Sequence, residues 1–178
     1  MKKKILTLIL TFTAFSAVYS DAVASLYSGY HDYIDDEGSR RISSISAEAA
    51  ADFIFGSVVG GIFVNGVFAV TEPKFILCKP GFEIGCLLWY TDLFYLITFR
   101  GAPVFHTESY VDKNMDICVG AEYRNYSRIS AGKNLFFMFG FAMDYYLNKK
   151  NMAYTINIGL GSEAFFNTPK EPVFQAVE

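Results

Sequence analysis

Histidine and cysteine are scarce in this sequence of 178 residues, which has two of the first and three of the second. An odd number of cysteines (Cys78, Cys86 and Cys118) cannot form a complete disulfide framework, and we expect free thiols packed as small apolar groups. No Cys/His cluster has zinc spacing, and neither a GxSxG motif nor a phosphate-binding glycine loop is present. With only His31 and His106 as candidate bases, we expect no enzyme activity, no catalytic residue, no metal site and no cofactor.

Charge is also limited, since only 19% of the residues are charged while 52% are hydrophobic and 17% are aromatic. The formal net charge of −3 gives no basic surface of the kind that binds nucleic acid. An apolar and aromatic content this high is unusual for a soluble domain. The composition therefore points away from a nucleic-acid partner and towards contact with lipid.

The N-terminus is typical of a secretory signal peptide. Lys2, Lys3 and Lys4 precede an uncharged apolar stretch over residues 5–17, which is too short for an ordinary membrane span. Small residues allow cleavage after Ser20 or after Ala24, and the second is the better small-x-small match. Cleavage would make the net charge about −6. An uncleaved N-terminal anchor is the alternative.

Three C-terminal segments alternate large apolar residues with small or polar ones: residues 116–124, 135–146 and 154–161. A period of two predicts β-strands. In the second segment Phe137, Phe139 and Phe141 share one face, while Gly140 and Asp144 lie on the other. Strands with large apolar residues on one face and glycine, asparagine, threonine or charged residues on the other are typical of a membrane barrel, which has an apolar outer surface and a polar interior.

Residues 53–70 carry no charge and meet the length of a transmembrane helix. Their four glycines and their content of Val, Ile and Phe favour strands instead. We expect a hairpin that turns at Gly60-Gly61 and pairs Val59 with Ile62. The alanine-rich segment 46–55 fits either a short helix capped by Ser46 or the start of a strand.

A second hairpin is expected over residues 82–90 and 93–99, with Tyr90 opposite Leu93. This register places Glu83 directly opposite Arg100, as a cross-strand charge pair. Beyond the Gly101-Ala102-Pro103 segment, residues 104–111 are interpreted as an extension of the same strand past a bulge. Together with a first strand over 25–34, this gives eight main strands.

The fold class is therefore all-β, a single antiparallel up-and-down transmembrane barrel of about eight strands. Eight strands enclose a space that side chains nearly fill, so inward polar groups should satisfy one another. The candidates for this interior polar network are Glu83, Arg100, Asp116, Glu122, Arg124, Asp144, Thr155 and Asn157.

The signal peptide, alternating strands, aromatic strand ends such as Tyr90, Tyr123 and Tyr145, and chain size together resemble the small eight-stranded outer-membrane barrels of the OmpA, OmpX and OmpW type. The resemblance is one of class, covers most of the chain and transfers no functional residue. Such barrels usually finish on an aromatic residue; here Phe166 could play that part, followed by a polar tail. The expected organisation is a signal peptide over 1–24, a barrel over 25–166 and a tail over 167–178.

We expect an exported outer-membrane barrel of a diderm bacterium with a structural, narrow-channel or surface-binding role. Its partners would be membrane lipid, a lipopolysaccharide-type surface and the outer-membrane assembly machinery, with a small solute or ligand possible. The loops 35–41 and 125–134 would carry any recognition. Two alternatives stay open: a soluble periplasmic barrel whose Phe137, Phe139 and Ile156 line an apolar ligand cavity, and a membrane-anchored protein that spans at 53–70.

Overall fold

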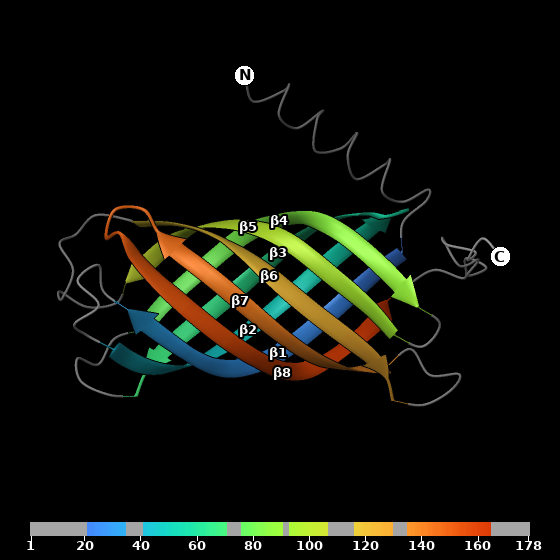
Figure 1. Ribbon diagram of the computed structural model, residues 1–178, viewed down its shortest axis with the longest axis horizontal. Coiled ribbons are helices and arrows are strands. Elements are labelled where there is room, and N and C mark those ends of the chain that lie inside the picture. The colour runs from blue at the N-terminus through green and yellow to red at the C-terminus, as the bar shows by residue number, and fades with distance from the viewer. Residues whose placement is uncertain are drawn as a thin grey trace, which may run out of the picture.

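The computed structural model describes residues 21–34, 41–70, 76–90, 93–106, 116–129 and 135–164. They form one closed barrel in which each strand pairs antiparallel with the next and the last pairs with the first (Figure 1). The eight-stranded up-and-down barrel expected from the sequence is confirmed. The strands are β1 (Asp21–Ile34), β2 (Arg41–Phe55), β3 (Val58–Ala69), β4 (Ile76–Tyr90), β5 (Leu93–His106), β6 (Asp116–Arg128), β7 (Leu135–Tyr146) and β8 (Asn151–Ala164).

The two ends of the barrel differ in the length of their connections. At one end, called here the turn end, β2–β3 and β4–β5 are joined by two residues each, and β1 begins and β8 finishes there. The opposite loop end carries the β1–β2, β3–β4, β5–β6 and β7–β8 connections, of which the β5–β6 connection spans residues 107–115. The two loops expected to carry recognition, 35–41 and 125–134, belong to opposite ends: 35–40 connects β1 to β2 at the loop end, whereas 129–134 connects β6 to β7 at the turn end. Residues 125–128 belong to β6 itself.

The hairpin within residues 53–70 is real, but its predicted turn is wrong. The chain turns at Gly56-Ser57, with Phe55 opposite Val58, and Gly60 and Gly61 lie inside β3. Gly56 has a φ of 63°, a conformation that glycine adopts at little cost. The alanine-rich segment that precedes it is strand throughout, because β2 pairs along its length with both β1 and β3.

The β4–β5 hairpin has the predicted register, with Tyr90 opposite Leu93 and Glu83 opposite Arg100. β5 continues to His106, so the extension is confirmed over residues 104–106, but without a bulge; residues 107–111 lie outside the described residues. Cys78 lies opposite Phe105 in the same register that pairs Phe82 with Gly101, so no residue is inserted between them. No residue pairs are recorded over the stretch in between, where this register places Pro80 opposite Pro103. Neither proline has a backbone N–H to donate.

The faces of the wall are those of a membrane barrel. Large apolar side chains alternate outward along every strand, including Phe137, Phe139 and Ile156, all of which are exposed. These three residues therefore do not line a cavity, and the alternative of a soluble barrel with an apolar lumen is wrong. Residues 53–70 are β2, turn and β3 rather than a helix, and no helix within the described ranges is long and apolar enough to cross a membrane.

Candidate functional site

Two arginines organise the middle of the barrel interior. Arg124, from β6, donates to Asp52 at 2.9 Å and to Glu83 at 2.6 Å, although these carboxylates come from β2 and β4. Arg100, from β5, donates to Glu48 at 2.8 Å and to Glu122 at 2.8 Å. Side chains in a narrow barrel reach across the lumen, so three of these contacts join strands that are not neighbours in the wall; only Arg100 and Glu122 come from paired strands.

Further groups complete this cluster, called here the ionic layer. Lys79 donates to Asp144 at 2.6 Å, and Arg100 Nε lies 3.6 Å from the same carboxylate. The Tyr27 hydroxyl donates to Glu48 and Glu122. Neutral donors satisfy other carboxylate oxygens: Asn65 on Glu48, Thr98 on Glu83 and Asn157 on Glu122. The layer thus contains five carboxylates and three cations, all of them buried. Each carboxylate has a cation within 4 Å, and such pairing is what makes buried charge tolerable.

The residues expected inside from the sequence are all buried, but they do not form a single network. Glu83, Arg100, Glu122, Arg124, Asp144 and Asn157 lie in the ionic layer. Asp116 instead accepts from the backbone N–H of Ile117 and of Asn148, near the loop end. Thr155 is paired with Nδ1 of His31 at 2.8 Å. Glu83 and Arg100 are opposite each other in register, yet Glu83 forms an ion pair with Arg124. Arg100 forms ion pairs with Glu48 and Glu122.

Sequence reasoning missed Glu48, Asp52 and Lys79. Glu48 and Asp52 were hidden because segment 46–55 could not be assigned to helix or strand. Lys79 precedes Pro80-Gly81, which resembles a turn in sequence but lies within β4. The available signal was alternation, since Glu48 and Asp52 lie an even number of residues apart on the same face of β2.

Apolar clusters close the lumen on both sides of the ionic layer. At the turn end, the ring of Phe94 stacks on Tyr126 at 4.5 Å between centroids and meets Phe136 edge-on. At the loop end, Val67, Leu77, Val104, Cys118, Tyr146 and Ala153 form a second buried cluster. The ring of Phe63 covers the guanidinium of Arg100 at 4.1 Å. The interior is therefore a packed core of polar middle and apolar ends.

The two histidines and the three cysteines occupy positions in the barrel wall and lumen. His31 is fully buried in the lumen and His106 is half-buried at the end of β5. Cys118 is buried, whereas Cys78 and Cys86 are exposed; the expectation that the three thiols are free is confirmed. In the described part of the chain no group of three His, Cys, Asp or Glu side chains could hold a metal ion.

Comparison with known proteins gives matches of structure alone. No protein-family model and no curated protein sequence matches the chain. Neisserial surface protein A (NspA) is 12% identical with a TM-score of 0.61, over 80% of this chain and 97% of its own. Ail, the attachment invasion locus protein of Yersinia pestis, is 6% identical with a TM-score of 0.59, over 83% of this chain and 100% of its own. A second Ail structure is a complex with the heparin analogue sucrose octasulfate, and matches with a TM-score of 0.54. At these identities the likeness establishes the fold: this chain is similar to small eight-stranded outer-membrane barrels.

Proposed function

We propose that the protein is exported to the outer membrane of a diderm bacterium and spans it as a closed barrel. The support is the wall itself: outward Phe, Ile, Val and Leu side chains surround the whole barrel, whereas the charged groups are inside. This division suits hydrocarbon outside and would be costly in water, where so large an apolar surface promotes association. The fold of NspA and Ail supports the same placement.

Export requires the N-terminal signal, and we propose that it is removed after Ser20 rather than after Ala24. β1 begins at Asp21, and residues 21–24 pair with residues 51–54 of β2. Removal of residues 21–24 would leave that part of β2 without one neighbour, and an unpaired strand edge is unfavourable in lipid. The polar tail over 167–178 and the proposed terminal aromatic, Phe166, lie outside the described residues.

The role that the geometry supports best is a non-conducting scaffold that displays its loops. The observation that carries this is the filled interior, since Arg100 and Arg124 are almost completely inaccessible and both ends of the lumen are packed with apolar side chains. A narrow channel would need a continuous wet path through these groups. No catalytic role is proposed, because His31 is enclosed within this core.

We propose that the loop end faces the cell exterior, since surface loops of such barrels are longer than their periplasmic turns. Contact with a lipopolysaccharide-type surface or a small ligand would then fall to residues 35–40, 71–75, 107–115 and 147–150. We do not extend the heparin-analogue complex of Ail to this chain, because Asp35, Asp36 and Glu37 make one of these loops acidic. Assembly machinery would engage β1 and β8, where the barrel closes.

Planar-bilayer recording tests the scaffold role. The purified barrel, with insertion verified by a heat-dependent mobility shift, should give no unitary conductance steps under conditions where a porin control gives them. Reproducible unitary steps from the barrel would contradict a closed interior. Trypsin added to intact cells tests the orientation: cleavage should occur after Arg40 or Lys113, and at Lys133 only once the outer membrane is permeabilised.

A further inference from the structure

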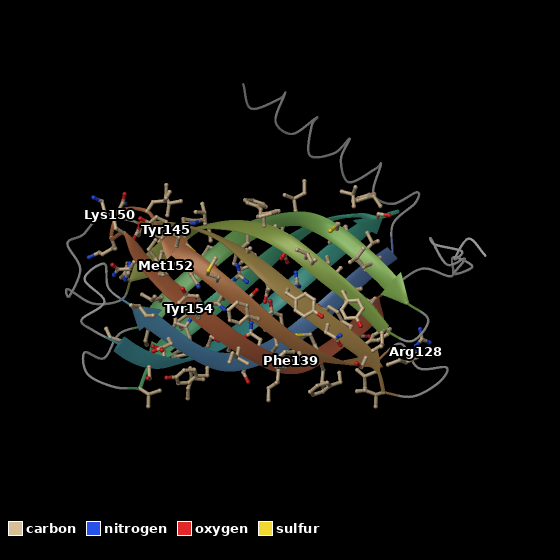
Figure 2. The ribbon with its side chains drawn as sticks, in the orientation of Figure 1. Arg128, Phe139, Tyr145, Lys150, Met152 and Tyr154 are labelled. Atoms are coloured by element: carbon tan, nitrogen blue, oxygen red, sulfur yellow. The ribbon has the colours of Figure 1, made fainter. Side chains whose placement is uncertain are left out.

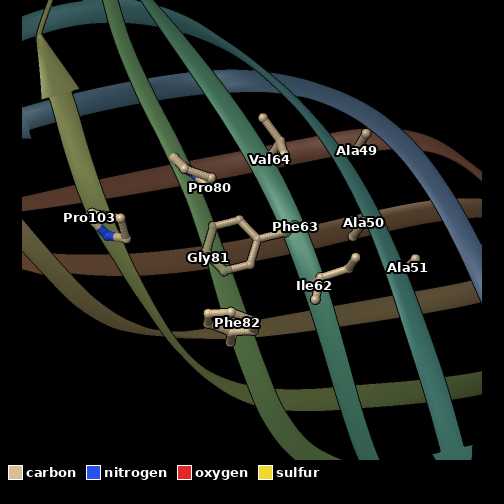
Figure 3. A pocket seen from close by; sticks show the side chains of 10 residues that line it. All are labelled: Ala49, Ala50, Ala51, Ile62, Phe63, Val64, Pro80, Gly81, Phe82 and Pro103. Atoms are coloured by element: carbon tan, nitrogen blue, oxygen red, sulfur yellow. The ribbon is translucent and has the colours of Figure 1, made fainter. Parts of the chain in front are cut away.

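One region of the outer wall is hollow. A cavity of about 540 Å³ spans β2 to β5 and is open on one side (Figure 3). Its outward residues are the small Ala49 and Ala51 of β2, bordered by Ile62 and Val64 of β3 and by Phe82 of β4. Ile62, Val64 and Phe82 are among the most exposed apolar side chains of the barrel, Phe82 at 74%. The cavity therefore opens on the outer face of the wall. Its lining also includes the buried Ala50 and Phe63, and the ring of Phe63 separates it from Arg100 of the ionic layer.

The break in the β4–β5 ladder forms one border of this cavity. Pro80 and Pro103 both line it, at the place where the register sets them opposite each other and no pairs are recorded. Two rings without N–H donors cannot close that part of the ladder. Gly81 leaves room for the ring of Phe63, which an added Cβ would approach to 2.5 Å. The cavity is thus a consequence of specific residues in four neighbouring strands.

The chemistry of the lining defines the occupant. Every residue that lines the cavity is Ala, Ile, Val, Phe, Pro or Gly, so no side chain offers a hydrogen bond or a charge. Elsewhere on the wall, as around Phe139, large side chains are exposed on the outer face (Figure 2). A hollow in a lipid-facing wall must be filled by hydrocarbon, because a void forfeits dispersion contacts and water there has no polar partner.

We propose that this cavity is a seat for one acyl chain of a membrane lipid, held longer than the lipids that surround the rest of the barrel. The inference rests on the proposed membrane embedding. The acyl chain lies over Ala49 and Ala51, between Ile62, Val64 and Phe82. The volume of the cavity is within the range of sites that bind small molecules, about 300–1,000 Å³. The lipid headgroup is not specified by this seat, since the lining is wholly apolar.

Photolabelling in vesicles tests the seat. The probe is a phosphatidylcholine with a diazirine near the end of one acyl chain, present as a minor fraction in unlabelled phosphatidylcholine vesicles that contain the full barrel. After illumination, labelled peptides are quantified by mass spectrometry. We expect labelling of the peptides with residues 49–51, 62–64 and 80–82 to exceed that of the peptide with Phe139 several-fold.

The double substitution Ala49→Leu with Ala51→Leu fills the cavity with side chains that point to lipid and should lower this ratio to about one. Ala47→Leu is the matched control, on the same strand and face but outside the cavity, and should leave the ratio unchanged. Correct folding of each variant is established by its heat-dependent mobility shift.

The outcomes separate the two proposals. Labelling at Phe139 without excess at the cavity, or an excess that survives the double substitution, would overturn the acyl-chain seat alone. Absence of labelling at Phe139 as well would overturn membrane embedding.

Discussion

Arg124 of β6 contacts carboxylates from three different strands of the barrel. It neutralises Asp52 and Glu83 by direct hydrogen bonds, and its Nε lies 3.5 Å from Glu122. All four groups are buried, so none of the three carboxylates can turn to bulk water if the arginine is lost. A buried charge left without its partner is far costlier than a weakened pair at the surface.

Arg124→Met should therefore lower the free energy of unfolding by about 3–5 kcal/mol. Urea-induced unfolding in lipid vesicles measures this loss. Arg128→Met, at the end of the same strand, is the matched control, because Arg128 is half-buried and stands over the ring of Phe136. We expect a clearly smaller loss from it. Equal losses for the two substitutions would contradict the central place of Arg124.

Phe139→Lys places a charge on the lipid face near the middle of β7. This substitution should cost about 2–4 kcal/mol and impair assembly, because a charged side chain at that depth is expensive in hydrocarbon. Phe139→Leu, which remains apolar, should assemble normally. The yield of the heat-modifiable form after refolding into vesicles measures both. Normal assembly of the lysine variant would count against a lipid-facing Phe139.

At the residue scale, the face of the wall that a residue occupies could be predicted where apolar and polar residues alternate without interruption. Glu122, Arg124 and Asp144 lie in segments of clean alternation, and their inward placement could be predicted. Their partners could not, because Arg124 contacts Asp52 across 72 residues of sequence. Periodicity assigns a face to a residue but says nothing about which strand lies across the lumen.

At the scale of single elements, the β2–β3 connection gives the sharpest test. Gly56→Ala should cost about 1–2 kcal/mol, because a positive φ brings Cβ close to the following carbonyl oxygen in an L-residue. The added methyl group meets no atom within 4 Å, so the cost is conformational. Gly60→Ala also meets none, but its φ is not positive, and we expect a change within about 0.5 kcal/mol. A larger loss of unfolding free energy for Gly60→Ala would instead support the turn predicted at Gly60-Gly61.

The start of β1 gives a second test at this scale. Cleavage after Ser20 should yield a mature protein whose first residue is Asp21. The intact mass of the protein purified from outer membranes, together with N-terminal sequencing, distinguishes this from a start at Ser25. A start at Ser25 would show that the barrel tolerates β2 without the first four partners that β1 supplies.

The turn expected at Gly60-Gly61 and the late start expected for β4, at residue 82 instead of Ile76, share a physical cause. Gly60-Gly61 and Pro80-Gly81 both resemble turns, yet each lies within a strand that has neighbours on two sides. Inside a barrel, glycine makes room for inward side chains of the neighbouring strands: an added Cβ at Gly61 would lie 2.5 Å from Asp52, its partner on β2. Local turn chemistry was therefore overridden by the closure of the barrel.

At the scale of the whole molecule, wall and interior depend on one another. Closure brings β1 beside β8 and gives each of the eight described strands a neighbour on both sides, which a lipid environment requires. The same closure makes the lumen so narrow that charged side chains must pair within it. The ionic layer and the apolar ends together favour a barrel that is anchored and closed, with four of its seven strand connections at the loop end.

Fractionation tests this account most directly. Membranes of the producing bacterium are separated, and unboiled and boiled samples of each fraction are compared on SDS gels. We expect the protein in the outer membrane, with a mobility that changes on boiling as the closed barrel unfolds. Recovery with the soluble periplasmic fraction, with no such change in mobility, would contradict a lipid-embedded barrel.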